Sequence, residues 1–388
     1  MKDIKELKLD KSNWRLVKLG DVVSEIRKTT KDPVADGLEN VVGLEHITPE
    51  DIHLRKAEPI SSETTFTKTF EKGDVLFGRR RAYLKKAAQA PFSGICSGDI
   101  TVMRVRKELR EDLLPFVINN DLFFDYAIKH SAGGLSPRVK WKDLANYEFL
   151  LPPKEEQARL AELLWSLDEV IEREREVLDS IRLAYSTVIQ KELISDTGEK
   201  THLANLGEVI RGVGYKPKDL LSEHSENSCI LLRSNNISHA KLNFEDINII
   251  PDRLVKHDQL LQKGDFAICM SNGSKELVGK CAEFKGLDSK VTIGSFCAGF
   301  RPKDIESGSL LNHLFNSESY RYTIKRILTG SAINNLKPSD IEGMYFKLNS
   351  DSEIIDKLDK LFSGIDMLEE KISISQSLQK SLINETFG

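Results

Sequence analysis

The chain contains only five cysteines in 388 residues, and no two of them form a CxxC pair. An odd, scattered set of this kind argues against a disulfide framework or a zinc site and fits a reducing cytoplasm. No apolar run approaches the roughly 18 residues that a membrane-spanning helix requires. The first residues are highly charged and lack the apolar segment of a secretory signal. We therefore expect a cytoplasmic protein with no membrane segment and no metal site.

Motifs of common catalytic sites are also missing. The sequence has no GxxxxGK[ST] phosphate loop, no glycine-rich loop directly after a strand, and no HExxH pair. It also lacks the Asn/Asp-Pro-Pro-aromatic segment that amino-methyltransferases use around a flipped base. A chain without these motifs is not expected to bind ATP, a dinucleotide or catalytic zinc by itself.

One weak catalytic pattern is present. Pro251-Asp252, followed by Glu283-Phe284-Lys285, matches the loose PD…ExK arrangement of magnesium-dependent nucleases. Two carboxylates there could hold the metal while the lysine orients the attacking water. Short patterns of this kind often arise by chance, and the first half of the chain has no counterpart. The pattern defines an alternative function, a self-contained magnesium-dependent DNA nuclease with a coiled-coil dimerisation element.

Charge is unevenly distributed along the chain, although the formal net charge is only −4. Residues 1–154 and 200–349 carry net charges of +4 and +3, whereas residues 155–199 and 350–388 carry −7 and −4. The overall value therefore conceals two larger, mildly basic segments that could face DNA and two short acidic ones.

The chain also repeats itself. Four short motifs of the first half recur in the same order in the second, with offsets of 187 to 197 residues. A set of ordered matches with similar offsets indicates an internal duplication. The matched pairs are Leu19-Gly20-Asp21-Val22 with Leu206-Gly207-Glu208-Val209, Lys72-Gly73-Asp74 with Lys263-Gly264-Asp265, Asp143-Leu144 and Phe149 with Asp340-Ile341 and Phe346, and Gln190-Lys191 with Gln379-Lys380.

Each half is predicted to combine a strand-rich globular domain with a long terminal helix. Short strands are expected at 74–77 and 265–269, and helices at 112–129 and 309–328. We predict an α+β fold in which two similar α/β domains are joined by two long antiparallel helices that form a coiled coil, with a pseudo-two-fold internal repeat. The boundaries are 1–153 and 198–349 for the domains, 154–197 for the first helix, which acts as a spacer, and 350–388 for the second.

The helical segments carry apolar heptads, which are typical of a coiled coil. Glu174 and Ser375 interrupt the apolar rows, and polar residues in such a seam can fix its register. Packing of each helix on its own domain is the alternative, and we favour mutual pairing because both helices are long, acidic and similarly patterned. The predicted seam residues are Leu160, Leu164, Leu167, Ile171, Leu178 and Ile181 in the first helix, and Leu358, Leu361, Ile365, Leu368 and Ile372 in the second.

In this order of domain, helix, domain and helix, the chain resembles the specificity (S) subunit of type I restriction–modification systems. The resemblance depends on Trp14-Arg15, Leu19-Gly20-Asp21, the strand at 72–77, and the exit Leu150-Leu151-Pro152-Pro153 before Glu155-Glu156-Gln157. The second half departs from the pattern at its exit, which reads Leu348-Asn349-Ser350, so the exit motif is weaker there.

The resemblance implies that each domain is a target recognition domain that reads one half of a split double-stranded DNA sequence. It implies that the helices hold two methyltransferase (M) subunits, which restriction (R) subunits join to make an ATP-dependent nuclease. The chain itself would then be non-catalytic and without a cofactor, whereas S-adenosylmethionine, ATP and Mg²⁺ would belong to the partners. Exposed Trp165 and Phe362 are candidate anchors for partners, and an isolated chain could self-associate through its helices.

Candidate DNA contacts are polar and cationic residues in three pairs of loops, because phosphate and base edges are read by such side chains. The first pair comprises Arg79, Arg80, Arg81, Tyr83, Lys85 and Lys86, and at the corresponding place Ser271, Asn272, Ser274 and Lys275. The second comprises Ser136, Arg138 and Lys140, and Ser331, Asn334, Asn335 and Lys337. The third comprises Glu45-His46, and Arg233, Asn235 and Asn236.

Simpler interpretations exist for these residues. Each loop could be an ordinary solvated turn, and the charges on the helices could be solvated faces. A coiled-coil assembly protein whose domains bind protein is therefore a third possible function, which sequence-dependent retention on DNA would distinguish from the first.

Overall fold

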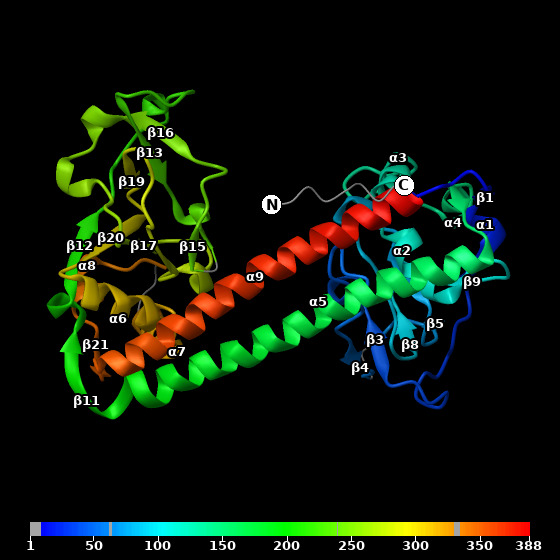
Figure 1. The fold of residues 1–388 in the computed structure, drawn as a ribbon, viewed down its shortest axis with the longest axis horizontal. Helices are drawn as coiled ribbons and strands as arrows, with labels where there is room; N and C mark the ends of the chain where they lie inside the picture. The colour runs from blue at the N-terminus through cyan, green and yellow to red at the C-terminus, as the bar shows by residue number, and fades with distance from the viewer. Residues whose placement is uncertain (1–8, 62–63, 239, 330–333) are drawn as a thin grey trace. The chain divides into compact units, whose positions relative to one another are not determined.

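The computed structural model describes residues 9–61, 64–238, 240–329 and 334–388. The chain divides into two compact units (Figure 1). The first unit contains residues 1–175 and 370–388, and the second contains residues 176–369. Both boundaries lie inside a long helix, so each unit contains the beginning of one helix and the end of the other. In the described part of the chain, no helix is both long and apolar enough to cross a membrane.

The first unit is built on two four-stranded sheets and a short strand pair. One sheet is antiparallel and has the order β2-β9-β6-β7, and the other has the order β4-β3-β8-β5, with β3 and β8 parallel. Strand β1 pairs with β10. The bounds are β1 Arg15–Lys18, α1 Leu19–Val22, β2 Val23–Ile26, β3 Asn40–Val42, β4 Glu58–Pro59, β5 Lys68–Phe70, β6 Val75–Gly78, β7 Ala87–Gln89, β8 Gly94–Cys96, β9 Ile100–Val105 and β10 Glu148–Leu151.

The second unit repeats this plan. Its antiparallel sheet has the order β12-β20-β17-β18, its second sheet has the order β16-β13-β19 with β13 and β19 parallel, and β11 pairs with β21. A further short pair joins β14 and β15. The bounds are β11 Ile194–His202, β12 Gly207–Arg211, β13 Ser228–Leu232, β14 Ile237–Ser238, β15 Lys241–Leu242, β16 Asn248–Pro251, β17 Phe266–Cys269, β18 Cys281–Glu283, β19 Val291–Ile293, β20 Cys297–Pro302 and β21 Tyr345–Leu348.

Each predicted domain helix is in fact two helices. The first is split into α2 (Leu114–Ile118) and α3 (Asp121–Lys129), and the second into α6 (Ile305–Phe315) and α7 (Glu318–Thr329). The break has the same cause in both units, because a polar side chain caps the second helix. The Asn120 side chain accepts the Phe123 N–H, and the Ser317 hydroxyl accepts the Tyr320 N–H. A short helix follows in each unit, α4 (Trp141–Leu144) and α8 (Pro338–Glu342).

The repeated Lys-Gly-Asp motif forms the same turn twice. Gly73 and Gly264 both have φ of 94°, in the left-handed region that glycine adopts at little cost. The following aspartates are buried, and each forms a bidentate ion pair with an arginine. Asp74 accepts from Arg104 at 2.6 and 2.8 Å, and Asp265 accepts from Arg301 at 3.0 and 2.7 Å. The motif is therefore a structural element of both domains.

The two long helices are α5 (Lys154–Val188) and α9 (Ser352–Phe387). The first was expected to extend to residue 197, but after Val188 one π-helical turn, Ile189–Leu193, leads directly into β11. The continuation was therefore wrong at its last turn, because Ile194 already pairs with Leu348 of β21. Seven of the predicted seam residues are buried, namely Leu160, Leu164, Ile171, Leu178, Leu358, Ile365 and Ile372. The other four, Leu167, Ile181, Leu361 and Leu368, are half-buried.

The helices pair antiparallel within each unit, as predicted. In the first unit the partly buried Ser375 hydroxyl donates to the Glu174 carboxylate at 3.2 Å, and Gln379 donates to Asp168 at 3.1 Å. Lys371 also pairs with Glu174 at 3.0 Å. The polar residues that interrupt the apolar rows thus bond to each other across the helix pair, which ties down its register.

In the second unit, the paired residues again run in opposite directions along the two helices: residue numbers on α9 decrease as those on α5 increase. Arg182 pairs with Glu369 at 2.8 Å, and Lys357 pairs with Glu192 at 2.7 Å. Between these pairs, the rings of Tyr185 and Phe362 pack at 5.7 Å. The pairing in this unit is therefore antiparallel as well.

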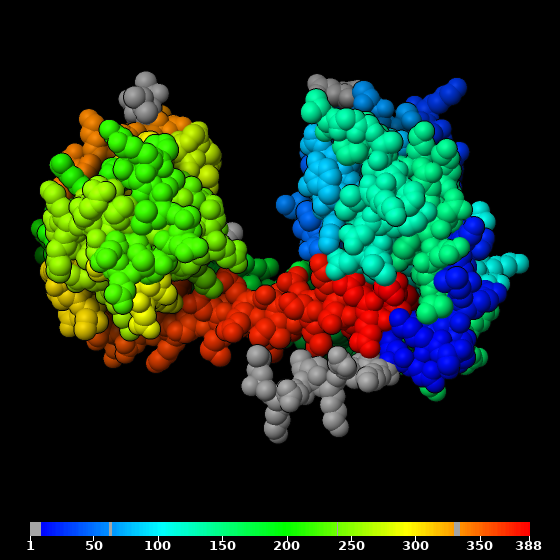
Figure 2. Space-filling view, turned by 90° about the horizontal axis from the view of Figure 1, so that it is seen from above, coloured from blue at the N-terminus to red at the C-terminus, as the bar shows by residue number. Residues whose placement is uncertain are grey.

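The long helices also pack on the domains, as the alternative prediction proposed. In the first unit, Leu160 and Leu164 of α5 share a core with Ile383 and Phe387 from the end of α9. Figure 2 shows these last turns of α9, in red, against the cyan surface of the first unit. The Asn384 side chain reinforces this contact, because it accepts from the Asp121 N–H and donates to the Asp121 carboxylate.

Trp165 and Phe362 were expected to be exposed, but both are half-buried. Trp165 packs edge-on against Phe116 with 5.1 Å between ring centroids, and its N–H donates to the Asp112 carbonyl. Phe362 packs against the His313 ring at 6.2 Å. Each ring is therefore half-buried against the domain of its own unit.

Candidate nucleic-acid interface

In the first unit the arginine-rich loop and the Gly/Ser loop come together. Arg80 and Arg138 form an isolated antiparallel bridge, and the Arg81 N–H donates to the Pro137 carbonyl at 2.8 Å. The Ser136 hydroxyl accepts from Arg80 at 3.1 Å and from Arg81 at 3.4 Å. Two segments that are far apart in the sequence thus form one cationic surface.

An acidic residue that the sequence did not single out organises this surface. Asp99 accepts two hydrogen bonds from Arg138, at 2.7 and 3.2 Å, and a longer one from Arg80 at 3.4 Å. The hydrogen bond from Arg138 and the charges of both arginines hold the pKa of Asp99 below its ordinary value. Asp99 therefore stays ionised at neutral pH and fixes two guanidinium groups side by side. The spacing of Asp99 from either loop in the sequence gave no signal of this role.

The second unit brings its corresponding loops together in the same way. Ser271 and Asn335 form an isolated antiparallel bridge. The Asn334 side chain donates to the Gly273 carbonyl at 3.2 Å, and the Asn272 side chain donates to the Ser234 hydroxyl at 3.4 Å. All three predicted loops of this half therefore meet, and they present amides and hydroxyls in place of guanidinium groups.

The two bridges occupy equivalent places in the repeats. Arg80 and Ser271 both follow the strand that begins after the Lys-Gly-Asp turn, β6 and β17 respectively. Arg138 and Asn335 both lie just before the short helix that leads to the exit strand. The duplication thus places different chemistry on one shared framework.

Several first-unit candidates are exposed and several are already engaged. Tyr83 is half exposed in the 3-10 turn Ala82–Leu84, which is flanked by Arg81 and Lys85 at positive φ. Lys85 bonds to Asp121 at 2.6 Å, and Lys86 donates to the Leu44 carbonyl at 2.6 Å. In this conformation the two lysines hold the loop against its own domain, and they are the weakest candidates of the set.

Two arginines of the first unit, Arg79 and Arg80, have a buried side-chain N–H group, at Nε, without a hydrogen-bond acceptor within the described part of the chain. Buried donors are normally satisfied, so these atoms are exceptions, as is the Nε atom of Arg233 in the second unit. Arg79 and Arg80 remain candidates for phosphate or base contacts.

The turn at residues 233–236 gives a mixed result. Arg233 and Asn235 both bond to the exposed carboxylate of Asp246, at 3.0 and 2.8 Å. Asn236 is buried, accepts from the Arg233 N–H, and donates to the carbonyls of Asn243 and Asp246. Its side chain is fully used inside the turn, so we correct its assignment from DNA contact to loop scaffold. His46 is buried at the equivalent turn of the first unit and accepts the Gly43 N–H in the same manner.

The last candidates lie at helix starts and loop tips. Lys140 and Lys337 are exposed residues at the starts of α4 and α8. Ser274 and Lys275 begin a 3-10 turn, and Ser274 is exposed. Ser331 lies outside the described residues, so its prediction is not addressed by the structure.

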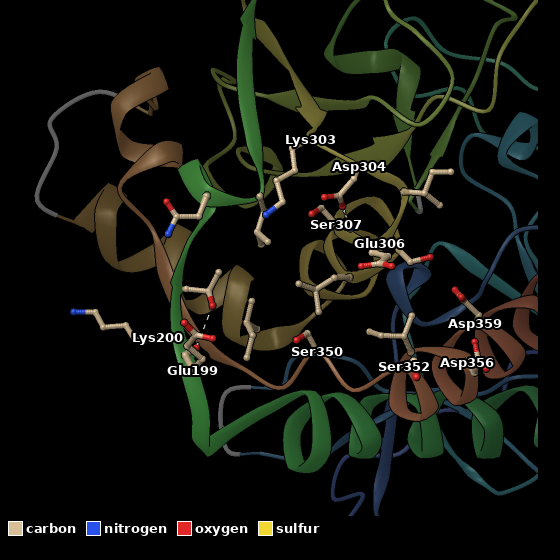
Figure 3. A pocket seen from close by; sticks show the side chains of 18 residues that line it. Glu199, Lys200, Lys303, Asp304, Glu306, Ser307, Ser350, Ser352, Asp356 and Asp359 are labelled. Atoms are coloured by element: carbon tan, nitrogen blue, oxygen red, sulfur yellow. Dashed lines mark hydrogen bonds between the residues drawn. The ribbon is translucent and has the colours of Figure 1, made fainter.

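A depression of about 690 Å³ lies elsewhere in the second unit, between β11, the start of α6 and the start of α9 (Figure 3). Its charged lining is mostly acidic, namely Glu199, Asp304, Glu306, Asp356 and Asp359 against Lys200 and Lys303. A surface with this balance repels phosphate, so it is a poor candidate for a DNA-binding face.

The residues of the nuclease pattern are paired with other groups. Asp252 bonds to Lys290 at 2.8 Å, and this partner holds the pKa of Asp252 below its ordinary value. Lys285 lies 3.8 Å from Asp366 of α9. Across residues 9–61, 64–238, 240–329 and 334–388, no cluster of three His, Cys, Asp or Glu side chains could hold a metal ion. The nuclease alternative is not supported.

Comparison with known proteins agrees with this description. A family model described as "Type I restriction modification DNA specificity domain" matches residues 11–183. The StySPI specificity subunit of a type I restriction enzyme from Salmonella potsdam is 33% identical over 176 residues, which cover 44% of this chain and 38% of that protein. The MjaVIII specificity subunit from Methanocaldococcus jannaschii is 22% identical over 82% of this chain and 78% of its own length.

Among solved structures, the S subunit of a type I restriction–modification system from M. genitalium covers 98% of both chains, with a TM-score of 0.57 and 14% identity. The match therefore shows a shared fold. The first half of the chain carries a type I DNA specificity domain, and the resemblance to type I specificity subunits is confirmed. The chain spans about two fifths of the length of the StySPI subunit that it matches.

Proposed function

We propose that this chain is the non-catalytic, sequence-specific DNA-binding subunit of a type I restriction–modification complex, and that it recognises a bipartite double-stranded target. The observation that carries the proposal is the pair of equivalent loop bridges, Arg80 with Arg138 and Ser271 with Asn335. A duplicated framework with two different sets of side chains suits a target whose two halves differ in sequence.

The chemistry of each loop set supports a different mode of reading. In the first domain, guanidinium groups fixed by Asp99 suit phosphate oxygens and the O6 and N7 atoms of guanine. In the second domain, Asn272, Asn334 and Asn335 offer the paired donor and acceptor that match the N6 and N7 atoms of adenine. We therefore assign the steeper dependence on salt to the first half-site, because binding there releases more counterions.

Partner docking is assigned to the long helices. On α5, Leu163, Val170 and Val177 recur every seven residues and are 44%, 45% and 49% exposed. On α9, Met367 and Ile374 are 71% and 56% exposed with the same spacing. Apolar residues at heptad spacing outside a helix pair are the signature of a face that takes further helices. We propose that helices of two methyltransferase subunits cover these residues.

The wider complex follows from the same proposal. Restriction subunits would join through the methyltransferase subunits, which would carry S-adenosylmethionine, while ATP and Mg²⁺ would serve the complete nuclease. The connecting helices would act as the spacer between half-sites. When isolated, the chain would self-associate through the same apolar residues.

A pull-down of the tagged full-length chain from its own cells tests the proposal, with mass spectrometry of the partners and mapping of methylated adenines in the genome. We expect an adenine methyltransferase in about twofold molar excess and methylation at a split sequence. A matched pair of variants separates the two surfaces. Arg80→Ala/Arg138→Ala should retain the partner and lose the methylation pattern, and Leu163→Asp/Val170→Asp should lose the partner. Recovery of the chain without a methyltransferase, and without sequence-dependent DNA retention, would refute the proposal.

A further inference from the structure

Phe296 is a large apolar side chain on the loop surface of the second domain. It is 69% exposed, in the turn between β19 and β20. Its main-chain carbonyl accepts the N–H groups of Met270 and Ser271 at 2.9 and 3.1 Å. These bonds fix the residue at the base of the loop that carries Ser271 and Asn272. A single exposed phenylalanine is common, but this one is held among the candidate base-reading residues.

The equivalent position in the first domain is Asp99. Asp99 lies directly before β9 as Phe296 lies directly before β20, and the Asp99 carbonyl accepts the Arg79 N–H at 2.9 Å as the Phe296 carbonyl accepts the Met270 N–H. The side chain of Asp99 is the acid that holds Arg80 and Arg138. The position is therefore central to the candidate interface in both domains.

The three hydrogen-bonded residues of the first domain, Arg80, Asp99 and Arg138, all have different counterparts in the second domain. Arg80 is replaced by Ser271, Arg138 by Asn335, and the acid between them by Phe296. Without the two cations, an acid at this position would have no partner and would repel phosphate. The replacement by an aromatic ring removes that charge and adds about the largest apolar surface that one side chain can offer.

We propose that Phe296 is a specificity-determining residue that packs against the 5-methyl group of a thymine in the half-site read by the second domain. The proposal rests on the proposed function and assigns to Phe296 a contact within it. Apolar contact with this methyl group in the major groove distinguishes thymine from cytosine, and the neighbouring Asn272 and Asn334 amides suit the adenine edges of the same A·T-rich sequence.

Deoxyuridine tests the contact directly, because it lacks the methyl group and keeps the hydrogen-bonding edge of thymine. The full-length chain, with any subunits that copurify, is first used to select its target from a pool of randomised duplexes. Each thymine of the second half-site is then replaced in turn by deoxyuridine, and affinity is measured for the wild-type protein and for Phe296→Ala. At one position we expect about a fourfold loss for the wild type, the effect of one buried methyl group, and no loss for the variant.

Two further variants guard against indirect effects. Phe296→Leu keeps an apolar side chain and should retain at least half of the deoxyuridine effect. Tyr322→Ala removes an aromatic ring that is 67% exposed on α7, and it should leave every affinity unchanged. Because Phe296 is on the surface, its removal is expected to leave the melting temperature unaltered.

The outcomes distinguish this inference from the function on which it rests. If the wild-type chain selects no sequence from the pool, the proposed function fails. If it selects a bipartite target but the second half-site contains no thymine, or if Phe296→Ala shows the same deoxyuridine effect as the wild type, only the inference on Phe296 is refuted. Loss of a copurifying protein from Phe296→Ala, with unchanged affinity for DNA, would also refute it and would make Phe296 a protein contact.

Discussion

The two domains share their internal ion pairs and differ at their loops. Asp74–Arg104 and Asp265–Arg301 close the same turn in each, whereas Arg80, Asp99 and Arg138 are replaced by Ser271, Phe296 and Asn335. The turns are fixed by ion pairs of buried aspartates that lie within the framework, so they do not depend on the loop side chains. The loop surface therefore differs in chemistry between the two domains, although the Lys-Gly-Asp turn that precedes it is the same in both.

The domains also differ where each meets its long helices. In the first unit the contact is apolar, with Phe116 against Trp165. In the second, His313 stands at the corresponding place, fully buried, between the Tyr185 hydroxyl at 2.9 Å and the Asp359 carboxylate at 3.1 Å. Burial holds the pKa of His313 below its ordinary value against the opposing effect of Asp359. A neutral imidazole then donates from Nε2 to Asp359 and accepts a hydrogen bond from the Tyr185 hydroxyl at Nδ1.

The largest effect on stability is expected when Phe116 of the first unit is replaced by histidine, the residue at the corresponding position of the second unit. Phe116→His removes a fully buried ring and introduces polar atoms into an apolar contact, so we expect a loss of about 3 kcal/mol in unfolding free energy. Urea unfolding followed by tryptophan emission measures it, because all three tryptophans belong to the first unit. Phe116→Leu is the control and should cost less than about 1.5 kcal/mol. Equal losses would show that burial of polar atoms is not the determining factor.

The next effect concerns the two loop surfaces. Arg80→Ala/Arg138→Ala should weaken DNA binding roughly 100-fold, about 2.7 kcal/mol, and should reduce the salt dependence by about two counterions. Ser271→Ala/Asn335→Ala should weaken binding less and leave the salt dependence unchanged. Arg173→Ala is the charge control, because Arg173 is an exposed helix residue paired with Glu169. Titrations at several salt concentrations measure all three, and identical salt slopes for the two loop variants would remove the distinction between the domains.

A smaller effect is expected from the reciprocal exchange. His313→Phe leaves the Tyr185 hydroxyl and the Asp359 carboxylate without their partner, and we expect a loss of roughly 1–2 kcal/mol in the second unit. Hydrogen exchange of peptides from α6 measures this loss. Adding Tyr185→Phe to His313→Phe should restore part of it, because the unpaired hydroxyl is then removed. An additive result in the double variant would show that the two side chains are not coupled.

The smallest effect is a difference in pH dependence between the units. The hydrogen bond to Asp168 raises the pKa of His53 above its ordinary value of 6.5, so its stabilising contribution is complete below pH 6.5 and is lost as pH rises through the raised pKa. The pKa of His313 is lowered, so its contribution is complete above pH 6.5 and is lost as pH falls. Between pH 7.5 and 5.5, the first unit should gain protection and the second should lose it, each by less than about 1 kcal/mol.

Hydrogen exchange, corrected for the intrinsic rate at each pH, measures this divergence unit by unit. His53→Gln should remove the change in the first unit only, and His313→Gln the change in the second only. A common shift of both units in the same direction would show that other groups dominate the pH response.

The sequence predicted the framework well because the framework is encoded locally. The duplicated Lys-Gly-Asp turn, the apolar strands and the heptads of α5 and α9 are patterns of neighbouring residues, and the structure contains each of them. It also matched the loops of one half with those of the other, but it did not predict that the loops within one half come together.

The remaining features depend on residues that are distant in the sequence. Asp99 and Phe296 acquire their positions only when the turn before β9 or β20 folds beside a loop from another part of the domain. Asn236 has the side-chain chemistry of a base-reading residue, yet it is buried and its hydrogen bonds hold its own turn together. The heptad pattern did not predict that Trp165 and Phe362 face the domains. Spacing shows which residues share a helix face, but it does not show what that face packs against.

The docking of Ile383 and Phe387 in the core of the first unit sets an order of events during translation. Residues 1–175 emerge from the ribosome before residues 176–369, whereas the helix segment that completes their core is made after them. At ~5–20 residues per second, synthesis of the intervening residues 176–369 takes roughly 10–40 s. The second unit is contiguous and can fold as soon as it emerges. The unit whose synthesis begins first is therefore the one whose core is completed last.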